Sequence, residues 1–436
     1  MLARMLNALH RSTGRVQARS FAHTAALALV WLTFALSGLV FSEPCPTDVL
    51  ALALIVLLPV MGLVRVTPLL GLFLLVWAAV AATGLVSATF AADTAKAVTH
   101  TLVSFFLAGS AFTFAAFIAH RPAENIKLIL NGFTVAALAA GLTGIAGYFS
   151  LIPDAEMFTK FGRAAGTFKD PNVFGPFLVP SVLYAIHTAL QRPLKKTLTP
   201  LALAGVLALA VFLSFSRGAW INLIVSLAIY LGLAFLTAAS NGRRQKIAFL
   251  SVSGAAMIAS VVGVSLQDES VARLVTERAS VAQSYDVGPE GRFGGQEKAT
   301  GLILEHPLGI GAAQFAPYYH HEEAHNVYLS MAMATGWLGS GLYIAAVLAT
   351  LGLGILQSFK RTPWQPLVLI AVAAFAANAA EGIIIDSDHW RHFYVLMAII
   401  WGGAAAEQRA AHPASTLAPA RRATRPVRIG APAGTA

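Results

Sequence analysis

His325 is the residue of this chain best placed to do proton chemistry. It lies in the stretch 292–339, the most polar long segment of a strongly apolar chain. Charged and histidine side chains are costly near a bilayer and usually serve a function there. The apolar run after His325 is longer than one span, so we predict a half-helix broken at Gly336 and Gly339. A helix start would keep the imidazole neutral and able to accept a proton, although a helix-capping role fits as well.

Three arginines could bind an anion such as a phosphate. Arg163 lies among small residues, Arg217 lies between two apolar segments, and Arg292 begins an amphipathic run. A guanidinium group matches two phosphate oxygens at once, which favours a diphosphate clamp. The alternatives are lipid anchoring for Arg217 and ordinary solvation for Arg292.

Two further patterns concern helix starts and metals. Asp170, Pro171 and Asn172 have the composition of a helix start, with Asp170 as the N-cap. The run from His321 to His325 matches the H-E-x-x-H pattern of zinc proteases. That pattern needs a continuous helix and a third ligand, whereas the residues just upstream favour a loop. We therefore predict no metal ligands, and an intramembrane zinc protease is a distant alternative.

Membrane-spanning helices must position these residues. The chain has 436 residues, of which 57% are hydrophobic and 11% charged, against about 25% charged in soluble domains. We predict an all-α polytopic membrane protein with about twelve transmembrane helices. The expected spans are 22–42, 47–64, 68–90, 98–119, 125–150, 172–190, 199–214, 219–238, 247–266, 337–356, 365–384 and 392–405.

Basic residues set the orientation of these spans. Most of the 30 lysines and arginines fall in alternate loops and in the two terminal segments, which the positive-inside rule places in the cytoplasm. The net charge of +10 therefore does not indicate nucleic acid. The predicted regions are a basic arm (1–21), nine helices (22–266), a large periplasmic loop (267–324), a half-helix with three further helices (325–405) and a disordered tail (406–436).

Three groups of residues together resemble the signatures of a known enzyme family. The first is 163–168 with Asp170, Pro171 and Asn172, and the second is 216–218. The third joins Arg292, 306–311 and the pair His325 and Asn326. Over about residues 150–405, the chain is similar to the O-antigen ligase and polymerase superfamily of bacterial envelope glycan assembly. One departure is Gln296, where many members have tryptophan.

The resemblance implies a fold, a location and a reaction. The fold would be that of the GT-C glycosyltransferases, in the bacterial inner membrane, with both termini cytoplasmic and the active site periplasmic. The donor would be a glycan on undecaprenyl diphosphate, and the acceptor of a ligase would be lipid A-core. Transfer would invert the anomeric centre without a metal or cofactor. The implied site has His325 as the base, Arg217, Arg292 and Arg163 on the diphosphate, and Asn326, Asp170 and Asn172 in support.

Other functions stay open at this point. One dominant external loop favours a ligase, and Val179 stands where the paired loop motifs of a polymerase would have glycine. An O-antigen or exopolysaccharide polymerase is nevertheless the main alternative, and a protein O-oligosaccharyltransferase is another. A solute transporter would carry charges or broken helices near the bilayer midplane. Glu381 is the acid that lies well inside a predicted span, and the sequence shows no partner for it.

Overall fold

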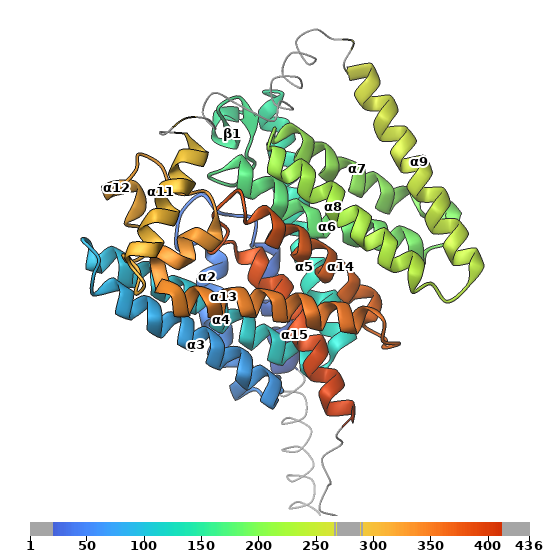
Figure 1. Ribbon diagram of the computed structural model, residues 1–436. Coiled ribbons are helices and arrows are strands. Elements are labelled where there is room, and N and C mark those ends of the chain that lie inside the picture. The colour runs from blue at the N-terminus through green and yellow to red at the C-terminus, as the bar shows by residue number, and fades with distance from the viewer. Residues whose placement is uncertain (1–20, 266, 268–287, 289–290, 412–436) are drawn as a thin grey trace, which may run out of the picture.

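The computed structural model describes residues 21–265, 267, 288 and 291–411 (Figure 1). The predicted basic arm lies outside these residues, apart from its last position. Most of the first half of the predicted large loop, and the tail beyond residue 411, also lie outside them. The candidate residues His325, Arg163, Arg217 and Arg292 are all described.

The described chain is a helical bundle with one very short hairpin. A first helix, Phe21–Ala35, precedes the labelled elements. These are α2 (Pro46–Val60), α3 (Pro68–Ala88), α4 (Thr94–His120), α5 (Pro122–Tyr148), η1 (Ala155–Phe158), β1 (Thr159–Lys160), β2 (Arg163–Ala164), α6 (Pro171–Gln191), η2 (Leu194–Lys196), α7 (Leu198–Leu213), α8 (Arg217–Leu236), α9 (Asn241–Ser265), α11 (Arg292–Glu305), α12 (Phe315–Tyr318), α13 (Val327–Ser358), α14 (Gln365–Glu381) and α15 (Arg391–Ala411).

The helices fall where the apolar segments predicted them. Each expected span overlaps a helix, although the first helix ends at Ala35 instead of 42 and α15 continues to Ala411, beyond the predicted end at 405. Six described helices, α3, α4, α5, α6, α8 and α13, are long and apolar enough to cross a membrane. The first helix, α2, α7 and α14 are apolar but shorter. An all-α membrane protein is therefore confirmed, while the number of twelve spans stays a prediction.

The helix that follows His325 is broken as expected. Inside α13 the backbone is non-helical at Gly336, with φ 69° and ψ −175°, a conformation almost restricted to glycine. The N–H of Trp337 donates to the carbonyl of Pro307 at 2.9 Å. Gly339 remains helical, and it lets α13 approach Thr83 of α3 closely. The loop after α11 thus packs into the break and fixes the short first segment of α13.

Contacts between loops sort the helix ends into two sets. One set contains the pairs Asp93–Gln314, Asp48–Arg391, Arg163–Ser214 and His100–Asp388. The other contains Lys246–Ala189 and Lys360–Glu407. The residues of the first set lie in or beside segments that were predicted to be external, and those of the second in or beside segments predicted to be cytoplasmic. In Figure 1, α11 and α12 lie beside the N-terminal end of α13, so they belong to the first set.

Candidate active site

His325 directly precedes the first turn of α13. Asn326 is the N-cap of this helix, and its Oδ1 accepts hydrogen bonds from the N–H groups of Tyr328 at 3.1 Å and Leu329 at 3.3 Å. The capping role that the sequence left open for His325 therefore belongs to Asn326. His325 itself has φ 48°, in the left-handed region that residues other than glycine rarely adopt. Its partly exposed imidazole is thus available for other contacts.

Two carboxylates flank the imidazole of His325. Its Nδ1 lies 3.9 Å from Oδ2 of Asp386, and its Nε2 lies 3.5 Å from Oε2 of Glu322. The hydroxyl of Ser330 donates to Oδ1 of Asp386 at 2.5 Å and fixes that side chain. Burial raises the pKa of Asp386, although the hydrogen bond from Ser330 opposes the shift. A carboxylate close to a histidine in this way can stabilise the protonated imidazole by its charge.

The loop helix α11 brings Arg292 to the same region. Gln296 lies one turn after Arg292, so both residues share one helical face. The Nε2 of Gln296 donates to the backbone carbonyl of His325 at 3.5 Å. Gly295 packs so closely on the ring of His320 that a β-carbon would lie 3.2 Å from it. The glutamine at the position where the family often has tryptophan therefore connects α11 to the His325 backbone.

Arg163 is held between two helix ends. Its Nε donates to the carbonyl of Ser214 at 2.7 Å, and a terminal nitrogen donates to Oδ1 of Asn172 at 2.8 Å. Asp170 is the N-cap of α6, and its Oδ1 accepts from the N–H of Asn172 at 2.8 Å. The predicted helix start is therefore confirmed. Asp170 and Asn172 support Arg163, and Arg163 in turn lies against the turn that precedes Arg217.

Arg217 is the first residue of α8, where Ser216 caps the helix by accepting from the N–H of Ala219 at 3.3 Å. Gly218 lies so close to α14 that a β-carbon there would collide with the carboxylate of Glu381. The Oε2 of Glu381 also accepts from the side-chain amide of Asn222 at 2.7 Å. Glu381 therefore has a partner that the sequence did not reveal, and it joins α14 to the Arg217 end of α8.

The end of α14 connects this turn to the His325 region. The N–H of Val327 donates to the carbonyl of Gly382 at 2.8 Å, and the hydroxyl of Tyr328 donates to the carbonyl of Ala379 at 2.6 Å. The loop after α14 then reaches Asp386 beside His325. Contacts between neighbouring helix ends thus link the segments that carry the four predicted functional residues.

A second polar cluster lies next to the first. Nε2 of His100 lies 3.4 Å from Oδ2 of Asp388, and the rings of His100 and His389 stack with centroids 4.0 Å apart. Within the described part of the chain, these three side chains form the group that could hold a metal ion. Stacked rings direct their lone pairs side by side instead of toward one point, however, and His389 Nε2 already lies 2.9 Å from the Ser104 hydroxyl. The cluster is therefore better suited to hydrogen bonding.

The zinc-protease pattern does not have the geometry that it needs. α12 ends at Tyr318 and α13 begins at Val327, so His321 and His325 lie in a loop between them. The carboxylate of Glu322 lies beside both imidazoles, at 4.0 Å from His321 and 3.5 Å from His325. The two histidines therefore do not share one face of a helix, as zinc binding by this motif requires.

A cavity of about 310 Å³, with both apolar and charged lining residues, lies between the two clusters. Its charged lining side chains are Lys96, Glu323, Asp386 and Asp388. Burial, together with the negative charges of Asp386 and Asp388, raises the pKa of Glu323. None of these four side chains was singled out by sequence reasoning as a functional residue. A pattern along the chain gives no signal for them, because they meet only through folding.

The comparisons with known proteins identify one region of the chain. A sequence model of the family described as O-Antigen ligase matches residues 202–344. This region runs from α7 into α13 and includes Arg217, Arg292 and His325, whereas Arg163 precedes it. Among curated proteins, no match was found.

Proposed function

We propose that this chain, which belongs to the O-antigen ligase and polymerase superfamily, is an O-antigen ligase. It would transfer a glycan from undecaprenyl diphosphate to a lipid A-core acceptor at the periplasmic face of the bacterial inner membrane. The family supports glycosyl transfer and lipid-linked glycan substrates in general. The choice of donor, acceptor and ligase activity is our proposal.

The proposed reaction is a metal-independent, inverting displacement at the anomeric carbon of the donor. The imidazole of His325 takes the proton of the acceptor hydroxyl as that oxygen attacks. The bond between the anomeric carbon and the diphosphate oxygen breaks on the opposite face, and its electron pair leaves with the diphosphate. Asp386 would stabilise the imidazolium that forms through its charge, since its carboxylate lies 3.9 Å from Nδ1.

The arginines would stabilise the departing diphosphate. Charge accumulates on the leaving group in the transition state, and preorganised cations beside it lower the barrier most. Arg217 and Arg292 each begin a helix, where the backbone N–H groups add to the attraction for an anion. Arg163 is the third member, held by the hydrogen bond from its guanidinium to Asn172.

One observation supports this proposal more than any other. The two roles that the sequence left open for His325 are separated in the structure, because Asn326 caps α13 and His325 faces Asp386. A histidine that serves only as a helix cap would need neither a half-buried carboxylate beside it nor a left-handed backbone. The arrangement resembles instead a general base with a carboxylate beside it.

Lipopolysaccharide profiles of a deletion strain test the proposal. Loss of all long chains attached to lipid A-core, restored by the wild-type gene and not by the His325→Ala gene, is the result expected of a ligase. A profile with a single attached repeat would show a polymerase instead, which the family match does not distinguish from a ligase. An unchanged profile in a strain that normally makes long chains would contradict both activities.

A further inference from the structure

One cavity of the structure shares Asp386 with His325 and has no role in the reaction proposed above. Its volume of about 310 Å³ is at the lower end of the range for small-molecule sites, which is roughly 300–1,000 Å³. The walls come from the start of α4, the segment 311–315, the first half of α13 and the loop before α15. The carboxylate of Asp386 is both a wall of this cavity and the partner of His325.

The charge of the cavity is opposite to that of the arginine side. Three carboxylates, Glu323, Asp386 and Asp388, line it, together with the single amine of Lys96. Such walls repel a diphosphate, so the donor's leaving group belongs with Arg163, Arg217 and Arg292, none of which lines this cavity. Carboxylates are strong acceptors for hydroxyl and ammonium donors. His325 is thus linked to the cavity through Asp386 and to α11, the helix that Arg292 begins, through Gln296.

We propose that this cavity binds the acceptor sugar, as a neutral or amino-bearing pyranose residue whose hydroxyl faces His325. The inference deepens the proposed transfer reaction and rests on it. Glu323 and Asp388 accept hydrogen bonds from the sugar, and Asp386 serves both the sugar and the imidazole. A sugar that carries a carboxylate or phosphate is excluded, because its charge would face three like charges.

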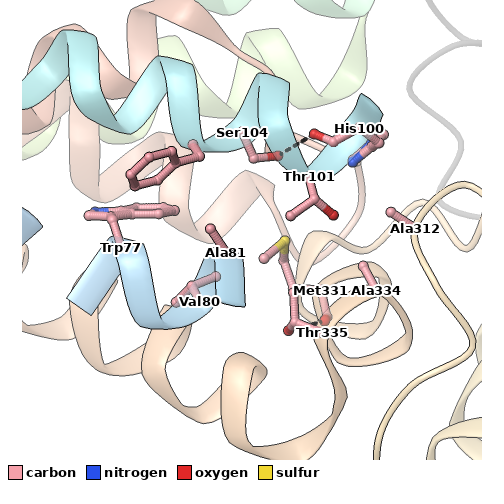
Figure 2. Close-up of a pocket in the computed structure, with 11 residues that line it drawn as sticks. Trp77, Val80, Ala81, His100, Thr101, Ser104, Ala312, Met331, Ala334 and Thr335 are labelled. Carbon is pink, nitrogen blue, oxygen red and sulfur yellow. Dashed lines mark hydrogen bonds between the residues drawn. The ribbon is translucent and has the colours of Figure 1, made fainter. Parts of the chain in front are cut away.

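The floor of the cavity suits the apolar face of a sugar ring. Figure 2 shows a smaller pocket of about 20 Å³, in which Met331 and Ala334 of α13 face Thr101 of α4. His100, Met331 and Ala334 line both spaces, so the smaller pocket adjoins the larger one. A ring that lies on these apolar atoms and points its hydroxyls at the carboxylates would satisfy both parts of the wall.

Binding of simple glycosides to the purified full-length protein tests the proposal without any transfer step. The probes are methyl glucoside, methyl glucosaminide and methyl glucuronide, observed by saturation-transfer NMR. We expect the amino sugar to bind best and the uronide to bind about tenfold or more weakly than the neutral glycoside, because the carboxylate of the uronide would lie close to like charges. Equal binding of all three, or of the uronide alone, would overturn the proposal.

Variants connect that binding to the cavity. Glu323→Gln and Asp388→Asn should reduce the preference against the uronide severalfold, whereas Lys96→Met should increase it. Glu156→Gln, an exposed acid in η1 outside the cavity, is the matched control and should change nothing. If Glu323→Gln or Asp388→Asn does not fold, the Lys96→Met variant still tests the location, because Lys96 is exposed. Unchanged selectivity in the folded cavity variants would contradict this location.

Transfer kinetics separate this inference from the proposed function. Glu323→Gln should raise the KM for the acceptor by about tenfold, by the same electrostatic reasoning, and leave the KM for the lipid-linked donor unchanged. An equal rise in both KM values would argue against an acceptor site. If the glycosides bind with the expected selectivity but no glycan transfer occurs, the proposed reaction fails while the sugar-binding cavity stands.

Discussion

At the scale of single residues, the three histidines of the loop before α13 have different surroundings. His325 faces Asp386, whereas the exposed His321 lies 4.0 Å from Glu322. His320 is buried, and its ring stacks on Phe315 with centroids 5.7 Å apart. The first is therefore placed for chemistry, the second for solvent contact and the third for packing.

His325→Ala should abolish most transfer while the protein stays folded and binds donor. Removal of a general base typically costs about a hundred- to ten-thousandfold in rate, because the acceptor hydroxyl then loses the group that takes its proton. Rates with purified donor and acceptor measure the loss, and thermal unfolding in detergent checks the fold. His321→Ala is the matched control and should retain most activity. Near-normal transfer by His325→Ala would end its assignment as the base.

Arg217→Lys keeps the positive charge but removes the planar fork that meets two phosphate oxygens. We expect a strong loss of transfer, toward the roughly hundred- to thousandfold cost of removing a transition-state donor entirely. The comparison of Lys and Ala variants at Arg217 and Arg292, in kcat and in KM for the donor, measures this. Full activity of both lysine variants would identify these residues as lipid anchors.

Asp386 gives the reaction a pH dependence of known sign. Burial raises the pKa of Asp386, so its carboxylate becomes protonated at higher pH than an ordinary aspartate as the solution is acidified. Protonated Asp386 no longer stabilises an imidazolium, and kcat/KM should therefore fall on the acid side. In Asp386→Asn, the rate should be lower throughout and the acid limb should change shape. A superimposable pH profile of this variant would show that Asp386 does not act on the base.

Among the elements, α13 has the most informative sequence. Its break at Gly336 lets the loop after α11 enter the helix, since the N–H of Trp337 bonds to Pro307. The short segment before the break carries the Asn326 cap and so sets the position of His325. The site therefore depends on a glycine eleven residues away, through the path of one helix.

Gly336→Ala should destabilise the protein and lower activity together. A β-carbon there would lie 2.6 Å from the carbonyl oxygen of Pro307, and φ is 69°, which costs on the order of 1–3 kcal/mol of strain. Gly341→Ala in the same helix is the control, because nothing lies within 4 Å of its β-carbon. Thermal unfolding in detergent compares the two. Equal unfolding temperatures would show that the break is not required.

At the scale of the whole molecule, contacts divide the helix ends into two groups, which bears on the orientation in the membrane. Loops that were predicted external contact one another, as in Asp48–Arg391, and predicted cytoplasmic loops do likewise, as in Lys360–Glu407. The grouping of the ends follows from the structure. Which group faces the periplasm rests on the distribution of basic residues, since lysine and arginine are retained in the cytoplasm.

Reporter fusions should place the two sets on opposite sides of the membrane. Fusions after Leu151 and Asp388 are expected to read periplasmic, and fusions near Lys195 and Arg244 cytoplasmic. Paired phosphatase and fluorescent-protein reporters at each position measure this, because each reporter is active on one side only. A periplasmic signal at Arg244 would overturn the arrangement of α8 and α9 and, with it, the twelve-span prediction.

The sequence by itself determined the features that depend on neighbours along the chain. Apolar segments located the helices, and the Asp170 cap and the break at Gly336 were predicted from local residue preferences. These signals are short-range, because helix periodicity, capping and glycine conformation act within a few residues. The family motifs around Arg217, Arg292 and His325 have the same local character, and the family match covers all three.

Tertiary structure alone decided which distant groups meet. Asp386 reaches His325 only because the start of α13 meets the end of α14. The hydrogen bond from the N–H of Val327 to the carbonyl of Gly382 shows this contact. Glu381 accepts a hydrogen bond from Asn222, which lies on another helix. The cavity with its three carboxylates is not indicated by any sequence pattern. The physical reason is that burial, pairing and cavity shape depend on helix packing, which spacing along one chain does not specify.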